Sequence, residues 1–97
     1  MPAKLRRSTG NVFRDLGFSR EEAEHLRLRS ELMAQLGQLI AERGLTQAAA
    51  ARLLGVTQPR ISDLVRGKIG LFSIDTLVDM LAHAGIRVEV TLKKRNA

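Results

Sequence analysis

The sequence predicts a mainly α-helical fold, a compact helical bundle followed by one short β-strand. Three observations support this prediction. Between residues 19 and 85, apolar residues recur at helical spacing, and a capping residue begins and a glycine ends each such segment. Beyond Gly85 the apolar residues alternate with polar ones, which is the period of a strand. The chain therefore divides into a basic arm with a docking segment (residues 1–18), a helical domain (19–85), and a strand with a basic tail (86–97).

Four helices are placed by their start and stop signals. Ser19 and Glu22 form a capping-box pattern, which begins a helix over residues 20–43 that ends at Gly44. Each of the next three helices begins at a hydroxyl side chain and ends before a glycine: Thr46 through Leu54, Thr57 through Arg66, and Ser73 through Ala84.

The two chain ends have different patterns. Residues 1–11 are basic and lack periodicity, so we expect an arm that is disordered, bound to a partner or laid along a DNA groove. Val12 to Phe18 is too apolar for a free tail and is expected to dock on the body or on a partner. The alternating residues after Gly85 predict a strand that pairs across a homodimer or, alternatively, with Val12 to Phe18; its dimerisation residues are Ile86, Val88, Val90 and Leu92.

The composition bounds the function. The chain has 97 residues, 44% hydrophobic and 27% charged, as expected for a single folded domain. No apolar run approaches the roughly 18 residues of a membrane span, and no secretory signal follows the first residues, so we expect a cytoplasmic protein without membrane contact. The absence of cysteine excludes disulfides, thiolate metal sites and cysteine nucleophiles.

The charge favours a nucleic-acid partner. Sixteen Lys and Arg against ten Asp and Glu give a net charge of +6, which suits a polyanion. The chain has no Trp or Tyr and three Phe, so it lacks the aromatic rows that bind single strands. We therefore expect double-stranded DNA as the partner and association with the nucleoid.

The stretch LTQAAAARLLGVTQPRISDLVRGK, from Leu45 to Lys68, predicts two crossed helices. Ala51 permits a close approach, Gly55 allows the turn, and Ile61 and Leu64 fill the angle between the helices. This stretch resembles the helix-turn-helix of the Cro and lambda repressor type, the XRE family. Gln47, Ala51, Gly55 and Ile61 match its positions 1, 5, 9 and 15. The resemblance implies a sequence-specific transcriptional repressor that binds its operator as a dimer.

The flanks extend the resemblance. The segments VFRDLGF, ERGLTQ, GVTQPRIS and RGK occur together in this order. The whole arrangement is similar to antitoxins of HigA type, which implies a type II toxin-antitoxin pair, autoregulation of its operon and a RelE-like toxin as partner. The acidic residues of the first helix and the apolar residues of Val12 to Phe18 are the candidate toxin surface. Two alternatives remain: a solitary XRE-type regulator without a toxin, and a protein-interaction module that no longer binds DNA.

The helix after Thr57 carries the predicted DNA contacts. A helical wheel buries Ile61, Leu64 and Val65, and the N-terminal end of the helix enters the major groove. Gln58 can bind adenine, Arg60 guanine or a phosphate, and Asp63 can accept from cytosine or hold Arg60 or Arg66. Gln47 resembles the family residue that binds a phosphate. The predicted DNA-binding residues are Gln47, Thr57, Gln58, Pro59, Arg60, Ser62, Asp63, Arg66 and Lys68.

The sequence predicts neither an enzyme nor a metal or cofactor site. His25 and His83 lie far apart without neighbours at ligand spacing, and His83 can instead pair with Asp79 one turn earlier. Residue types of a catalytic triad occur, but no nucleophile elbow surrounds them.

Overall fold

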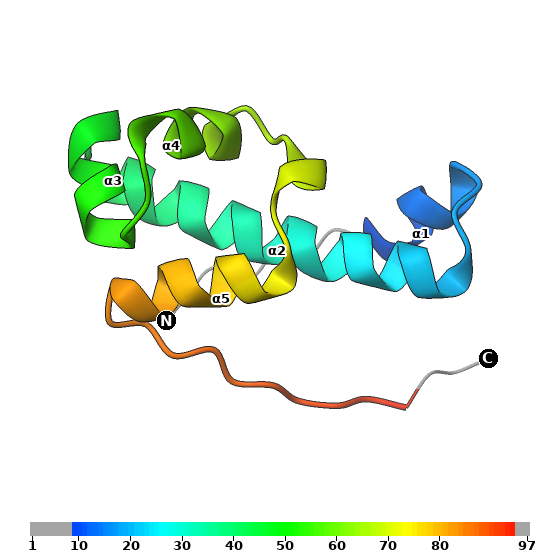
Figure 1. Ribbon diagram of the computed structural model, residues 1–97. Coiled ribbons are helices and arrows are strands. Elements are labelled where there is room, and N and C mark those ends of the chain that lie inside the picture. The colour runs from blue at the N-terminus through cyan, green and yellow to red at the C-terminus, as the bar shows by residue number, and fades with distance from the viewer. Residues whose placement is uncertain (1–8, 95–97) are drawn as a thin grey trace.

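The computed structural model describes residues 9–94, and the side chains from Val12 onward, as a helical structure (Figure 1). The elements in chain order are α1 (Thr9–Asp15), α2 (Arg20–Glu42), α3 (Gln47–Leu54), α4 (Gln58–Val65), the short 3-10 helix η1 (Ile69–Leu71) and α5 (Ile74–His83). No helix within these residues is long and apolar enough to cross a membrane.

Helix α2 is the axis of the molecule. Helices α3 and α4 lie along one side of its C-terminal half, α5 lies along another side, and α1 folds back beside its N-terminal end (Figure 1). Contacts join α2 to α1, α4, η1 and α5, and α3 to both α4 and α5. Helix α4 is thus supported directly by α2, whereas α3 packs mainly on α4 and α5.

The core lies between α2, α3, α4 and α5. Every fully buried hydrophobic side chain of this cluster comes from residues 33–81, and no polar or charged residue is buried among the described residues. Such burial contributes about 1.5–3 kcal/mol for each large side chain. The largest side chains that are almost completely buried are Phe72, Leu36, Leu54, Ile61, Leu77 and Met80.

The predicted helix starts of the body are confirmed. Ser19, Thr46, Thr57 and Ser73 each accept a hydrogen bond from the backbone N–H three residues later. At Ser19 the capping box is complete, because the Glu22 carboxylate also accepts from the Ser19 N–H at 3.1 Å. The four helices end one residue before their predicted ends or, for α3, at the predicted residue. Local capping chemistry therefore fixes the boundaries of this region.

Helix α1 was not predicted. The expectation for residues 1–8 lies outside the described residues, but Thr9 to Asp15 forms a helix in place of the end of the arm and the start of the docking segment. Phe13 and Phe18 meet edge to face with their ring centroids 6.5 Å apart, and Arg14 donates to the Phe18 carbonyl. Packing on α2, rather than a capping signal, sustains this short helix.

The predicted C-terminal strand is not formed among the described residues. Residues 86–94 run alongside the body without regular secondary structure, and they do not pair with Val12 to Phe18 as a strand (Figure 1). Ile86 and Val88 are half-buried against the core, whereas Val90 is 77% and Leu92 is 89% exposed. A single extended segment gains no ladder hydrogen bonds, so alternation alone does not make a strand. Pairing across a dimer has no support from this arrangement.

Candidate nucleic-acid interface

The turn between α3 and α4 is closed tightly. Gly55 ends α3 in the left-handed region at φ 70°, and the next residue, Val56, donates from its backbone N–H to the Ala51 carbonyl at 3.0 Å. Thr57 then caps α4. These three adjacent residues set the crossing of the two helices, as the spacing in the sequence predicts.

The imidazole of His83 covers this turn. Its Nδ1 donates to the carbonyl oxygen of Leu53 at 3.1 Å, so the expected pairing with Asp79 is replaced by a bond to α3. A Cβ atom at Gly55 would lie 2.7 Å from the His83 ring. The last turn of α5 therefore holds the end of α3, and a side chain at residue 55 has no room.

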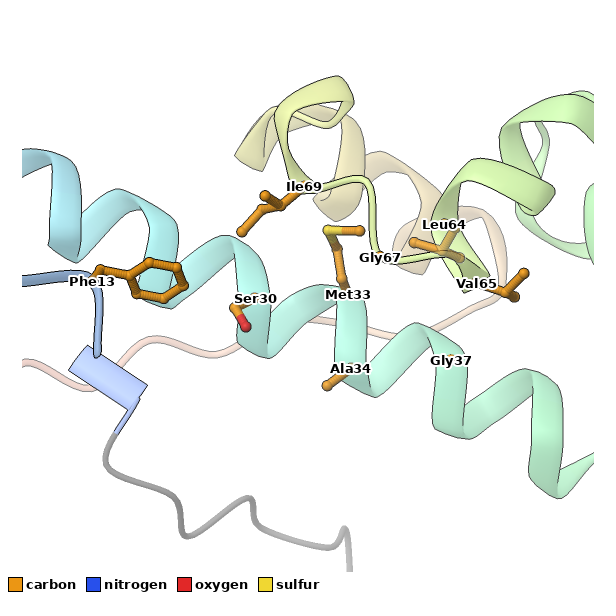
Figure 2. Close-up of a pocket in the computed structure, with 9 residues that line it drawn as sticks. All are labelled: Phe13, Ser30, Met33, Ala34, Gly37, Leu64, Val65, Gly67 and Ile69. Carbon is orange, nitrogen blue, oxygen red and sulfur yellow. The ribbon is translucent and has the colours of Figure 1, made fainter. Parts of the chain in front are cut away.

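One face of α4 is buried and the opposite face is free. Ile61 is 0% and Leu64 4% exposed, as predicted, but Val65, which was expected beside them, is 50% exposed. Val65 is the last residue of an eight-residue helix, where the chain leaves the core. It borders an open groove of about 600 Å³ between α1, α2, α4 and η1. Figure 2 shows Leu64 and Val65 on one side of this groove and Phe13 on the other.

The exposed end of α4 carries the predicted base-reading residues. Thr57, Gln58 and Pro59 are exposed at the start of the helix, and Ser62 is partly exposed one turn later. Pro59 lies in the first turn, where its missing N–H removes no helical hydrogen bond. Gln47 is exposed at the first position of α3. Short polar side chains at a protruding helix end can reach base edges in the major groove.

Arg60 differs from its expected role. Its guanidinium lies over the ring of Phe72, 4.5 Å from the ring centroid, and its Nη1 donates to the Leu71 carbonyl at 3.1 Å. Both partners belong to the segment after α4, eleven or more residues away. The structure therefore directs Arg60 to the protein rather than outward from α4.

Asp63 is placed beside Lys68. The Oδ1 of Asp63 and the Nζ of Lys68 are 3.6 Å apart, so the partner of this carboxylate is neither Arg60 nor Arg66. Gly67, at φ 74°, makes the turn that brings Lys68 back toward α4. The backbone N–H of Lys68 also donates to the Asp63 carbonyl at 3.1 Å. Lys68, whose side chain is about half exposed, thus lies next to α4.

Arg29 was missed by sequence reasoning. This residue of α2 donates from Nη1 to the carbonyls of Ile69 and Phe72, at 3.3 and 3.4 Å. The partners are 40 and 43 residues away, so no local period or spacing relates them.

The N-terminal half of α2 carries Glu21, Glu22, Glu24 and Glu31, and ion pairs partly neutralise their negative charge. Arg27 pairs with Glu24 at 2.5 Å and with Glu31 at 2.6 Å, and the hydrogen bond to Glu24 is the main cause that raises the pKa of the Arg27 guanidinium.

No group of three or more possible metal ligands occurs among residues 9–94. No charged residue borders the groove of Figure 2.

Comparisons with known proteins agree with this geometry. A family described as a helix-turn-helix domain matches residues 12–93. A solved structure described as a proposed XRE-family transcriptional regulator is similar, with a TM-score of 0.70 and 34% sequence identity. The similarity covers 76% of this chain and 83% of that one. A search of curated proteins gave no match.

Proposed function

We propose a specific repressor function for this chain, which belongs to the helix-turn-helix domain family and is a DNA-binding transcriptional regulator. The family and the fold are those of a regulator rather than of an enzyme. The observation that supports repression at a defined operator is the short polar end of α4, exposed while Ile61 and Leu64 hold the opposite face in the core. A protein bound in the major groove of DNA at a promoter blocks transcription because it occupies the promoter.

We assign two kinds of DNA contact. Gln58 and Ser62, with Thr57 and Pro59 beside them, read base edges, because they are the outward residues at the start of α4. Gln47, Arg66 and Lys68 bind phosphates, since an exposed cation or a residue at a helix N-terminus suits an anion. Asp63 pairs with Lys68, and Arg60 contacts Leu71 and Phe72 in the segment after α4.

Operator selection from a random duplex library tests this assignment. Gln58→Ala should weaken binding to the selected operator by about 1–3 kcal/mol and relax the preference at one base pair, because it removes a bidentate base contact. Lys68→Ala is the matched comparison: it should weaken binding to every duplex and reduce the salt slope by about one. Equal weakening on all duplexes by Gln58→Ala would contradict the placement of α4 in the groove.

The protein is proposed to bind DNA as a homodimer that uses the segment from Ile86 to Leu92. Val90 and Leu92 are strongly exposed apolar residues that a second copy of the chain would cover. Val90→Ser with Leu92→Ser tests this without disturbing Ile86 and Val88, which pack on the chain's own core. Sedimentation should show a dimer that weakens in the double variant. An unchanged dimer would remove this segment from the interface.

We further propose that the chain is the antitoxin of a type II pair and binds a RelE-like toxin through α1. Val12 in α1 is 52% exposed and Leu16, in the turn directly after α1, is 68% exposed. Helix α1 packs on α2, whose N-terminal half carries Glu21, Glu22, Glu24 and Glu31, and this surface is remote from the start of α4 (Figure 1). Such a surface suits a cationic protein with an apolar anchor. Val12→Ser with Leu16→Ser should abolish co-purification with a small basic protein encoded next to this gene, while operator binding is retained. Absence of such a neighbour would favour a solitary XRE-type regulator.

A further inference from the structure

The segment between α4 and α5 is anchored by Phe72 in the core and by Ile69 against it, but its middle is exposed. None of the residues of η1 is buried, Leu71 is 50% exposed, and no side chain caps the start of η1 at Lys68. Yet this segment begins with the lysine that stands beside the reading helix. The exposed part of this turn, from Lys68 to Leu71 apart from Ile69, needs contacts other than core packing to keep one conformation.

Two arginines from different helices supply these contacts. Arg29 reaches from α2 and donates to the carbonyls of Ile69 and Phe72. Arg60 reaches from α4, donates to the carbonyl of Leu71 and covers the Phe72 ring. Phe72 itself is 1% exposed, so the ring under Arg60 is anchored in the core. The segment is thus fastened at both ends to α2 and α4.

The chemistry of these contacts requires arginine. A planar guanidinium can stack on a ring and donate in its own plane at the same time, whereas the compact ammonium of lysine cannot. Neither Arg29 nor Arg60 forms an ion pair among the described residues. Their positive charges therefore remain available to a polyanion. An arginine-to-lysine change keeps this charge but removes the planar stacking and hydrogen bonding of the guanidinium, so the two contributions can be separated.

From these contacts we propose that Arg29 and Arg60 are positioning residues of the DNA interface. They fix the turn from Lys68 to Phe72 against α2 and α4, so that Lys68 meets a phosphate while the start of α4 meets the bases. This inference rests on the proposed DNA-binding function. It replaces direct base reading by Arg60 with action through the backbone of the turn.

The test compares Arg60→Lys and Arg29→Lys with the full-length wild-type protein. We measure affinity for the selected operator as a function of salt and the amide hydrogen exchange of Leu71 and Phe72 in the free protein. In Arg60→Lys, loss of the stack and of a hydrogen bond should lower operator affinity about tenfold. The salt slope should stay unchanged because the charge is kept. The amides of Leu71 and Phe72 should exchange faster in both variants.

Arg20→Lys is the control, because Arg20 is an exposed arginine at the first residue of α2, whereas α4 lies beside the C-terminal half of that helix. Wild-type affinity and wild-type exchange in both test variants would overturn the positioning role. Loss of preference at a single base pair with unchanged exchange would assign Arg60 to base reading and also overturn it. If the wild-type protein bound no duplex, the proposed function itself would fail, and this result is distinct because the exchange measurement needs no DNA.

Discussion

The body from α2 to α5 and the two chain ends use apolar residues in opposite ways. Leu36, Ile61 and Leu77 in the body are completely buried, whereas Leu16 just after α1 and Leu92 near the C-terminus are 68% and 89% exposed. The body buries most of its large apolar residues within one chain, with Val65 and Leu71 half exposed at its edge. At the ends, the most exposed apolar residues have no cover from the chain itself, and they are the ones that we propose to be used by partners.

The largest predicted effect is in the body. Leu36→Ala, in the centre of α2, should lower the free energy of unfolding by about 2–5 kcal/mol, because it removes buried methyl groups and leaves a cavity. Urea denaturation followed by circular dichroism measures the change. A loss below about 1 kcal/mol would show that the body is loosely packed and would weaken the contrast with the ends.

The two glycine turns beside α4 separate strain from crowding. Gly55→Ala forces φ 70° on a side chain and places its Cβ against His83, so we expect a loss of about 2–4 kcal/mol. Gly67→Ala has a similar φ of 74° but nothing within 4 Å, and should cost about 1 kcal/mol. Unfolding free energies of both variants check the difference. His83→Ala should reduce the effect of Gly55→Ala, and a persistent difference without the ring would exclude crowding as its cause.

Two helix caps with equal geometry give a smaller contrast. The Thr46 and Ser19 side chains each accept from a backbone N–H at 3.1 Å, but Thr46 lies in the body and Ser19 between α1 and α2. Thr46→Ala should lower global stability by about 1 kcal/mol. Ser19→Ala should mainly speed amide exchange in the first turn of α2, since that end can open locally. Equal global losses would show that α1 and the start of α2 unfold together with the body.

The smallest effect is expected at the C-terminal end. Leu92→Ala should change the unfolding free energy of the monomer by less than about 0.5 kcal/mol, because this side chain is almost fully exposed. Dilute samples measured by thermal unfolding avoid a contribution from self-association. A larger loss in the monomer would mean that residue 92 has contacts within its own chain.

Local signals made the body predictable. A hydroxyl cap and a terminal glycine act within a few residues, so the bounds of α2, α3, α4 and α5 follow from the sequence almost to the residue. Helix α1 did not follow, because it depends on packing against α2. The prediction of a strand after Gly85 was wrong. Alternating apolar and polar residues indicate an extended segment with one covered face, and such a segment is a strand only if a neighbouring strand pairs with it.

The interface was predictable only in part. Residues at the start of α4 were predicted to read bases from the turn at Gly55 and from helical spacing; they are exposed, and their role stays a prediction. The roles of Arg29 and Arg60 depend on carbonyls of η1 and on the Phe72 ring, which only the folded chain brings close. The periodicity of a sequence predicts which face of a helix is apolar. It does not predict which backbone carbonyl accepts a hydrogen bond from a long side chain.

The contact between His83 and Gly55 sets a rule for how relatives can diverge. Gly55 follows α3 and His83 ends α5, 28 positions later, yet the His83 ring lies where a Cβ at position 55 would be placed. We therefore expect a relative with asparagine at position 55 to carry a smaller residue at position 83 or a ring that is turned away from position 55, whereas a relative that keeps glycine can keep the ring in place. These two positions are consequently expected to change together across an alignment.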